Sequence, residues 1–444
     1  MPIDLTPPFT PGQKVQCAIL TLGFGGSGIA KPNGFTVFVP KTYPGDELWI
    51  EIQEVKRRFA FAIPVEWTRR APERIEPPCP HFDRCGGCHL QHVPASLALE
   101  WKTRHLRETF EKIAKKHPPR MRPMFQPERN YGYRNKTTYQ VGPDGTMGYT
   151  SVDKSSLLPI DACAIASPAL DSAWRSVASA CVGLPRGLRY VTLRETTTGQ
   201  IAVIFSVESD EPRAWIQRLD DRWPRNEGAF SYLAPIPVGH FSPFDRDILP
   251  ISGPQALTER FDGIDFLLSP GDFFQVHPET AEQMLAQASQ WRGIHSPKKV
   301  LDLYCGVGFF SLPMARAGSE VLGIELSRSS ILSAERSAKA NGLEAKAQFR
   351  TGKASTLIER IYREGARFDA CVLDPPRKGA DPEVIGGLSK LGIQRVLYVS
   401  CSPATFARDW QALEAEGFRL EEIFPLDMFP QTYHVELMAS FSRP

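Results

Sequence analysis

The chain has 444 residues, of which 42% are hydrophobic and 23% charged, and its formal net charge is +2. This length exceeds what one ordinary hydrophobic core needs, so two or three domains are expected, and the balanced charge excludes a protein that is strongly basic or acidic as a whole. No apolar run approaches the roughly 20 residues of a membrane helix, and the N-terminus lacks the parts of a signal peptide, which indicates a cytoplasmic protein without a membrane partner.

The first 68 residues predict a small β-barrel. Short strand-like stretches are broken there by Gly and Pro, at residues 14–22, 35–40, 47–55 and 60–67, with a glycine-rich turn at 23–28. Several short strands at such close spacing are typical of small barrels, some of which bind single-stranded nucleic acid. We therefore assign residues 1–68 to a barrel domain.

A cysteine cluster follows the barrel. Cys79, Cys85 and Cys88 lie within ten residues, and Cys163 is the nearest cysteine downstream. In a cytoplasmic protein such spacing predicts a metal centre rather than disulfides. Four thiolates suit either a cubane iron–sulfur cluster or zinc. The remote fourth cysteine favours iron–sulfur, because zinc sites usually combine two close pairs, but nearby histidines keep zinc open: His81, His89 and His92.

Residues 101–136 combine positive charge with aromatic rings. They hold eleven Lys or Arg against three Glu, together with Trp101, Phe110, Phe125, Tyr131 and Tyr133. Such a mixture suits a phosphate backbone and its stacked bases, so contact with RNA or DNA is one interpretation. A solvated helix face followed by a polar loop is the other, since residues 94–116 predict an amphipathic helix. Residues 69–268 as a whole predict an α+β domain.

Strands and helices alternate from residue 269 to residue 444. The predicted strands, each followed by a helix, are 299–304, 320–325, 347–350, 369–374 and 395–400, and two late strands end the chain at 419–424 and 434–440. This order predicts a doubly wound, Rossmann-like α/β domain, which binds its ligands beyond the carboxyl ends of the strands.

The first of these strands runs into a glycine-rich turn, Asp302-Leu-Tyr-Cys-Gly-Val-Gly. Gly306 and Gly308 let the backbone turn sharply and approach a ligand, and Glu325, at the end of the next strand, can accept hydrogen bonds from ribose hydroxyls. Ser311 stands where a third glycine would favour NAD. S-adenosylmethionine fits better because it has no pyrophosphate, and a plain tight turn is the remaining interpretation.

Two later strand ends carry reactive groups. Asp374 opens the stiff run Asp-Pro-Pro-Arg-Lys-Gly, and Cys401 lies between a strand and a helix whose positive end is expected to lower the pKa of the thiol. A thiolate that adds to carbon 6 of uracil makes carbon 5 able to attack an electrophilic methyl group, after which a base removes the carbon-5 proton. Glu436, if desolvated, is the candidate base, and His434 is the alternative.

At these runs the chain resembles the S-adenosylmethionine-dependent RNA uridine-5 methyltransferases, in particular the branch acting on 23S ribosomal RNA. The matching runs are Gly271-Asp-Phe-Phe-Gln-Val, Asp302-Leu-Tyr-Cys-Gly-Val-Gly, Asp374-Pro-Pro-Arg-Lys-Gly, Ser400-Cys-Ser-Pro-Ala-Thr and His434-Val-Glu436. The resemblance covers essentially the whole chain, and it likens the N-terminal barrel to the RNA-binding TRAM module of that family.

The resemblance implies roles for single residues. It makes Cys401 the nucleophile and Glu436 the base, and it assigns contacts with the cofactor or the target base to Gln275, Tyr304, Glu325 and Asp374. It also strengthens the iron–sulfur prediction, because the ribosomal-RNA branch carries a [4Fe–4S] cluster on such cysteines. The ligands would then be Cys79, Cys85, Cys88 and Cys163.

The expected function is therefore methylation of carbon 5 of a uridine in 23S rRNA, with RNA as the partner and no protein partner indicated. The same chemistry on a tRNA uridine and a catalytically dead rRNA-binding assembly factor are the alternatives. Ser402 and His277 stand where the family often has Asn, and Phe309 replaces a polar residue. These departures affect fine contacts and leave the thiol chemistry unchanged.

Overall fold

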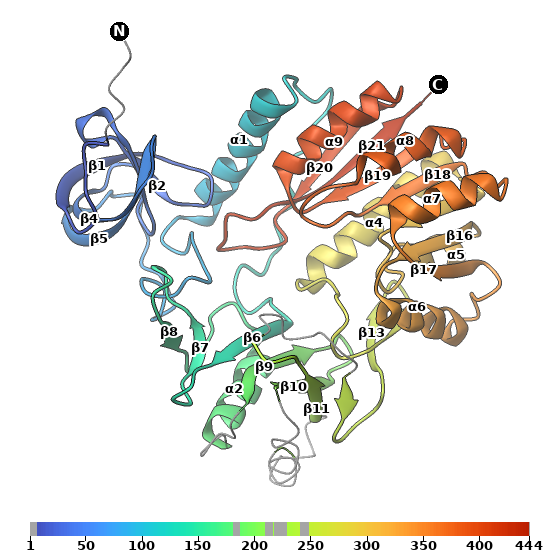
Figure 1. Cartoon of the computed structure of the whole chain (residues 1–444), viewed down its shortest axis with the longest axis horizontal. Helices are drawn as coiled ribbons and strands as arrows, with labels where there is room; N and C mark the ends of the chain where they lie inside the picture. Colours follow the sequence, from blue (N-terminus) through green and yellow to red (C-terminus); the bar gives the residue numbers. More distant parts are fainter. Residues whose placement is uncertain (1–6, 181–186, 209–215, 217–228, 240–247, 444) are drawn as a thin grey trace. The chain divides into compact units, whose positions relative to one another are not determined.

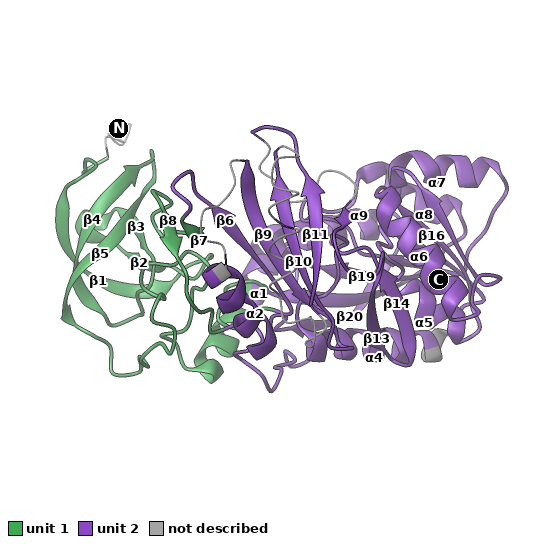
Figure 2. Cartoon of the chain, turned by 90° about the horizontal axis from the view of Figure 1, so that it is seen from below, with its two compact units in different colours: residues 1–105, 146–164, 429–434 green, residues 106–145, 165–428, 435–444 purple. Residues whose placement is uncertain are grey.

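The computed structural model describes residues 7–180, 187–208, 216, 229–239 and 248–443. The chain divides into two compact units, which Figure 2 shows in different colours. Unit 1 holds residues 1–105, 146–164 and 429–434, and unit 2 holds residues 106–145, 165–428 and 435–444. Among the described helices, none is long and apolar enough to cross a membrane. The predicted domain limits at residues 68 and 268 stay predictions.

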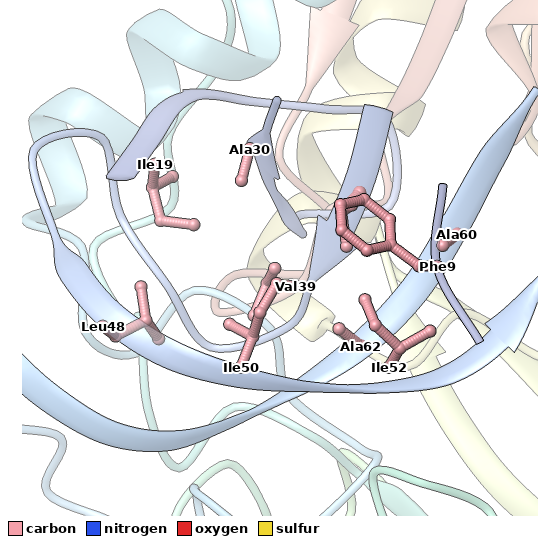
Figure 3. Close-up of a cluster of buried hydrophobic side chains, with 10 residues drawn as sticks. Phe9, Ile19, Ala30, Val39, Leu48, Ile50, Ile52, Ala60 and Ala62 are labelled. Atoms are coloured by element: carbon pink, nitrogen blue, oxygen red, sulfur yellow. The ribbon is translucent and has the colours of Figure 1, made fainter. Parts of the chain in front are cut away.

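Unit 1 begins with a closed barrel of short strands (Figure 1). The strand order is β1-β2-β3-β5-β4, with bounds β1 Lys14–Leu22, β2 Gly28–Ala30, β3 Thr36–Val39, β4 Glu47–Val55 and β5 Phe59–Arg69, and the 3-10 turn η1 Pro32–Gly34 precedes β3. Because side chains alternate across a strand, every second residue points inward. Ile19, Val39, Leu48 and Ile50 fill the interior together with Phe9 (Figure 3). The predicted barrel is confirmed.

The rest of unit 1 consists largely of loops, and hydrogen bonds connect these loops to segments that are distant in the sequence. It contains the cysteine loop, residues 429–434, and the hairpin of β7 Met147–Thr150 and β8 Leu157–Pro159. The amide of Gly86 donates to the carbonyl of Thr150 (3.0 Å), and the amide of His89 donates to that of Gln431 (2.8 Å). Helix α1 Ala95–Ile113 begins in this unit, at the position where an amphipathic helix is predicted.

Unit 2 contains a mixed sheet and a separate hairpin. Within the unit the sheet order is β12-β11-β10-β9-β6, with bounds β6 Lys136–Val141, β9 Leu188–Glu195, β10 Ile201–Val207, β11 Ala229–Pro235 and β12 Leu249–Pro250. Helix α2 Pro168–Ala180 packs against β9, and its Trp174 stacks on Tyr139 of β6 with ring centroids 3.5 Å apart. The hairpin pairs β13 Leu257–Phe261 with β14 Ile264–Leu268 and precedes the second sheet of the unit in the sequence.

The second sheet of unit 2 confirms the predicted doubly wound domain. Its order is β17-β16-β15-β18-β19-β21-β20, and its strands are β15 Lys299–Leu303, β16 Glu320–Glu325, β17 Ala347–Thr351, β18 Ala370–Leu373, β19 Arg395–Ser400, β20 Arg419–Leu426 and β21 Glu436–Ser442. The order reverses between β15 and β18, which is where such sheets bind ligands. The strand β21 pairs antiparallel with both β19 and β20, so β21 enters the sheet at the edge where β19 ends.

Six helices connect and flank this sheet (Figure 1). Their bounds are α4 Pro278–His295, α5 Ser311–Arg316, α6 Arg328–Ala340, α7 Ala354–Arg363, α8 Pro382–Lys390 and α9 Pro403–Ala415. Helix α8 contacts both α7 and α9, so these three form one layer, while α4 contacts α5. The turns that connect strands to helices lie at the carboxyl edge of the sheet, and they carry the candidate site.

Three aromatic rings of the basic stretch 101–136 belong to hydrophobic cores. Only 5% of Trp101, 0% of Phe110 and 1% of Tyr133 is exposed. Phe110 packs edge-on against Phe406, and the ring of Tyr133 stacks on a histidine. The interpretation of these three rings as stacking surfaces for nucleic acid bases is therefore wrong, because neighbouring side chains already cover their faces.

Candidate active site

The turn after β15 leaves open space at the carboxyl edge of the sheet. Tyr304, Gly306 and Gly308 all have positive φ angles (64°, 54° and 84°), a region that favours glycine and that Tyr304 occupies at a cost in strain. A Cβ atom added at Gly306 would meet no other atom within 4 Å, so the backbone there is open to a ligand. Cys305, by contrast, is buried, and burial raises the pKa of its thiol well above the ordinary value, which agrees with its having no assigned catalytic role.

Glu325 lies beside this open turn, at the end of β16. Its Oε2 accepts a hydrogen bond from the amide of Gly306 (3.3 Å), and its Oε1 accepts one from the amide of Ser327 (2.8 Å). The parallel pairing of β15 and β16 brings the two strand ends together. Glu325 and Gly306, nineteen positions apart in the sequence, therefore form one half-buried corner.

Sequence reasoning missed a second acid in this corner. Asp302 is 1% exposed, its Oδ2 accepts a hydrogen bond from the hydroxyl of Ser311 (2.5 Å), and its buried Oδ1 has no hydrogen-bond partner. The pKa of Asp302 is raised to about 7, mainly by burial and also by the charges of Asp374 and Glu325. An acidic residue inside the apolar strand Val300-Leu-Asp-Leu was the available signal. Ser311, noted in the sequence only as a missing glycine, is its partner.

The candidate nucleophile and base lie on neighbouring strands. Cys401 is half-buried and follows β19, and Glu436 is buried as the first residue of β21. These strands run antiparallel with Ser400 opposite Leu437, so the next step of the same register brings Cys401 opposite Glu436. Directly opposed residues of an antiparallel pair have Cα atoms about 4.5–5.5 Å apart. The two groups, thirty-five positions apart in the sequence, thus meet at one edge.

The thiol of Cys401 is not activated in the way that the sequence predicts. Burial raises its pKa to about 11, and the negative charges of Glu436 and Asp374 add to this, while Arg377 opposes it. The expectation of a lowered pKa is wrong, because burial and the charges of Glu436 and Asp374 raise the pKa of this thiol more than Arg377 lowers it. The thiol of the ligand-free site is therefore protonated at neutral pH.

The carboxyl group of Glu436 has the property expected of a base held in an apolar site. Its pKa is raised well above the ordinary value, first by burial and then by the charge of Asp374, with Arg377 acting in the opposite sense. Burial also raises the pKa of Asp374 to about 7, with a further contribution from Glu325. Acidic groups that face one another in a buried site disfavour one another's charge, and a cation bound among them would relieve this.

Gln275 belongs to a loop that leads from the hairpin to α4. Its side chain is half-buried, and its carbonyl accepts a hydrogen bond from Nδ2 of Asn135 (3.1 Å). The loop is fastened by Asp272, whose carboxylate accepts hydrogen bonds from the hydroxyls of Ser329 (2.9 Å) and Ser333 (2.6 Å). Phe273, two residues before Gln275, is 69% exposed and projects from a loop that is otherwise firmly held.

The three departures from the family pattern have structural positions. His277 is buried, stacks on Tyr133 (4.5 Å between centroids), and has its Nε2 3.1 Å from the carbonyl oxygen of Arg129. Phe309 is buried among other phenylalanines, including Phe274 (5.3 Å). Ser402 precedes α9, and its amide donates to the hydroxyl of Ser400 (3.1 Å). His277 and Phe309 thus pack the core near the site.

All four predicted metal-binding cysteines belong to unit 1. Cys85 and Cys88 are buried, and Cys79 and Cys163 are half-buried. The amide of Gly87 donates to Sγ of Cys85 (3.3 Å), and the ammonium group of Lys41 donates to the carbonyls of Cys85 (3.0 Å) and Cys88. Within the described ranges, no three His, Cys, Asp or Glu side chains are gathered in a metal-binding arrangement.

The histidines considered as zinc ligands have other surroundings. Nε2 of His81 lies 2.5 Å from a carboxylate oxygen of Asp161, and Nε2 of His92 lies 3.2 Å from the carbonyl oxygen of Thr42. Burial lowers the pKa of both His89 and His92 to about 3. At His81 and His92 one ring nitrogen is therefore already engaged by an oxygen of the protein.

Comparison with known proteins agrees with this arrangement. The tRNA (Uracil-5-)-methyltransferase family matches residues 264–443, and the TRAM domain family matches residues 8–65. The chain is 31% identical to an uncharacterized RNA methyltransferase of Halalkalibacterium halodurans, over 97% of each protein. It is also 31% identical to the 23S rRNA (uracil(1939)-C(5))-methyltransferase RlmD of Pectobacterium atrosepticum, over 97% of this chain and 94% of that one.

A solved structure has the same fold. The Pyrococcus abyssi tRNA (uracil-54, C5)-methyltransferase, in complex with S-adenosyl-L-homocysteine, superimposes with a TM-score of 0.75 and 25% identity. The match covers 96% of this chain and all of that one.

Proposed function

Since this chain belongs to the family of S-adenosylmethionine-dependent RNA uracil-5-methyltransferases, we propose that it methylates carbon 5 of a uridine in 23S rRNA through a temporary bond between Cys401 and the uracil ring. The single observation that supports this chemistry most strongly is the register of β19 and β21, which brings Cys401 opposite Glu436. A nucleophile and a base on one strand edge can address adjacent carbons of one flat ring.

The residues of the chain and the solvent account for the protons and electrons. The thiol of Cys401 gives its proton to solvent and adds as the thiolate to carbon 6, which breaks the double bond between carbons 5 and 6 and makes carbon 5 a nucleophile. After carbon 5 has gained its methyl group, the carboxylate of Glu436 takes the carbon-5 proton. The carbon–sulfur bond then breaks, the double bond forms again, and the thiolate is released. His434, the alternative base, lies outside the strand that carries Glu436.

The corner around Gly306 fits the cofactor. S-adenosylmethionine supplies an electrophilic methyl group on a positively charged sulfur. The open backbone at Gly306, the half-buried Glu325 and the buried Asp302 offer space and negative charge for a cationic ligand with hydroxyl groups. We propose that the adenosine and amino acid portions contact residues from four connecting turns: Gln275, Tyr304, Gly306, Gly308, Glu325 and Asp374.

An RNA substrate of ribosomal origin is favoured over tRNA. The relative named as a 23S rRNA enzyme is more similar to this chain than the solved tRNA enzyme, at 31% against 25% identity. We propose that residues 1–68 contribute RNA binding, that residues 69–268 form a separate central domain, and that residues 269–444 form the catalytic domain. Mass spectrometry of rRNA and tRNA from a strain lacking the gene separates the two substrates, because 5-methyluridine disappears from one of them only.

We further propose that Cys79, Cys85, Cys88 and Cys163 hold a [4Fe–4S] cluster that stabilises unit 1. Three of them lie in one short loop with two glycines, the amide of Gly87 points to a sulfur, and the ammonium group of Lys41 offsets negative charge beside the loop. We expect four iron atoms and four sulfides per chain, with an absorbance band at about 400 nm. Equimolar zinc in a colourless sample contradicts the cluster.

The thiol mechanism is tested with 23S rRNA transcribed with 5-fluorouridine. Because fluorine cannot leave as a cation, the base cannot complete the reaction, and a protein–RNA adduct that survives denaturation is expected. Cys401→Ala should form no adduct, whereas the matched control Cys17→Ala, in the barrel, should form as much as the wild type. An adduct in the Cys401→Ala protein, or methyl transfer by it, refutes the assignment. A wild type that binds rRNA but transfers no labelled methyl identifies an assembly factor instead.

A further inference from the structure

One aromatic ring of unit 1 stands out from the barrel instead of filling it. Phe24 is 62% exposed at the tip of the turn between β1 and β2. The turn is closed by a hydrogen bond from the amide of Gly23 to the carbonyl of Ser27 (2.8 Å), and Gly25 and Gly26 have φ angles of 91° and 74°. A Cβ atom at Gly26 would approach Cβ of His89 to 3.0 Å, so the turn is seated tightly. The exposure of Phe24 is therefore built into the backbone.

The exposed ring ends a stack of rings. Phe24 stacks on His105 with centroids 5.0 Å apart and planes 29° apart, and His105 stacks on Trp101 at 5.8 Å and 18°. Tyr433 meets Phe24 edge-on at 5.5 Å and 65°. His105 covers one face of Phe24, so the large exposed fraction of the ring leaves the opposite face to solvent.

The stack rests on a rigid base. Trp101 is buried, and its indole nitrogen donates to the carbonyl of Leu22 (3.3 Å). The segment that carries Tyr433 is held from two sides, by amide hydrogen bonds from His89 and Leu90 to the carbonyl of Gln431 and by the ammonium group of Lys102, which donates to the carbonyl of Phe429 (3.2 Å). Four segments of the sequence thus fix one aromatic face before any ligand arrives, which lowers the entropic cost of binding.

We propose that the free face of Phe24 stacks on an unpaired base of the RNA substrate. This proposal rests on the proposed function, since it names the part of unit 1 that holds the RNA. A single preorganised ring suits a nucleobase, whose flat face matches its area, whereas a stable protein interface needs roughly 800 Å² on each partner. The exposed Arg104 adjoins His105 in the basic stretch, and a cation there suits the phosphate of a stacked nucleotide.

The test measures methylation of unmodified 23S rRNA, transcribed in vitro, by the full-length protein. Base–aromatic stacking contributes about 1–3 kcal/mol, so Phe24→Ala should raise the KM for RNA about 5- to 150-fold. The kcat at saturating RNA and the Kd for S-adenosylmethionine should stay within twofold of the wild type. Phe24→Trp should keep the KM within threefold, because indole also offers a flat face. The slope of log affinity against log salt should not change, since no charge is removed.

Phe61→Ala is the matched control. Phe61 is also an exposed phenylalanine of the barrel (43%), but its ring packs against Phe38 and Phe59, and no histidine of the described ranges stacks on it. Its KM for RNA should not change. Stacking of Phe24 on an RNA base is refuted if Phe24→Ala leaves the KM for RNA unchanged, if Phe24→Trp raises this KM as much as Phe24→Ala, or if Phe61→Ala raises it equally. A wild type that neither binds nor methylates RNA refutes the proposed function itself, which is a different result.

Discussion

The strongest prediction about folding stability concerns Asp409, a buried acid on helix α9 that belongs to no recognised sequence motif. Only 1% of its surface is exposed. Its Oδ2 accepts hydrogen bonds from the hydroxyl of Tyr398 (2.6 Å) and the amide of Ala380 (2.8 Å), and its Oδ1 accepts one from Nε of Arg408 (2.8 Å). Tyr398 lies three residues before Cys401, and Ala380 directly follows the run that begins at Asp374. We therefore treat Asp409 as a positioning residue for both groups.

The expected cost of removing this carboxylate follows from its partners. In Asp409→Ala, the Tyr398 hydroxyl and the Ala380 amide are left buried without an acceptor, and each such group costs about 1–3 kcal/mol. The free energy of unfolding should thus fall by about 2–6 kcal/mol. Tyr398→Phe removes one hydrogen bond to a charged group and should cost about 1.5–3 kcal/mol. Because the two residues share that bond, the losses should not add in the double variant.

Two measurements check this reasoning. Urea unfolding followed by circular dichroism gives the change in stability, and hydrogen exchange of the peptide that contains Ala380 reports whether the loop opens locally. Glu414→Ala is the control on the same helix, because Glu414 makes a more exposed ion pair with Lys116 and should cost at most about 1 kcal/mol. An Asp409→Ala protein as stable as Glu414→Ala, or additive losses in the double variant with Tyr398→Phe, would show that the network does not hold the loop.

Three further predictions follow from the site and the cysteine loop. Glu436→Gln should accumulate a methylated protein–RNA adduct with ordinary uridine, visible by mass spectrometry, because the carbon-5 proton has no acceptor; free product at the wild-type rate would exclude Glu436 as the base. The free energy of unfolding should fall as pH rises from about 4 to about 7. The reason is that folding raises the pKa of Asp302 and of Asp374 from 3.8 to about 7, so that the folded state holds their protons more tightly. Urea titrations at several pH values should show a weaker pH dependence for Asp302→Asn, and an unchanged pH dependence would contradict the burial argument. Removal of iron by a chelator under reducing conditions should destabilise unit 1, as measured by faster proteolysis of the 79–92 loop, and equal proteolysis with and without iron would argue against a structural cluster.

Local sequence patterns were sufficient for the architecture. Alternating apolar residues between closely spaced turns predicted the barrel, because the strand period of two can be read from neighbours in the chain. Repeated strand–helix units predicted the doubly wound sheet, and the glycines at 306 and 308 marked the turn that the structure leaves open. Cys401 could be proposed as the nucleophile because thiol chemistry depends first on residue type and on its place at a strand end.

Properties that depend on distant neighbours needed the tertiary structure. The raised pKa of Cys401 comes from burial and from Glu436 and Asp374, whose charges the helix argument ignored. Trp101 turned out to support a stack from within a core, whereas Phe24, which no pattern marked, carries the exposed face. Burial, register and electrostatic coupling arise from through-space contacts between residues far apart in the chain, and so a one-dimensional pattern can name a reactive group but cannot state its environment.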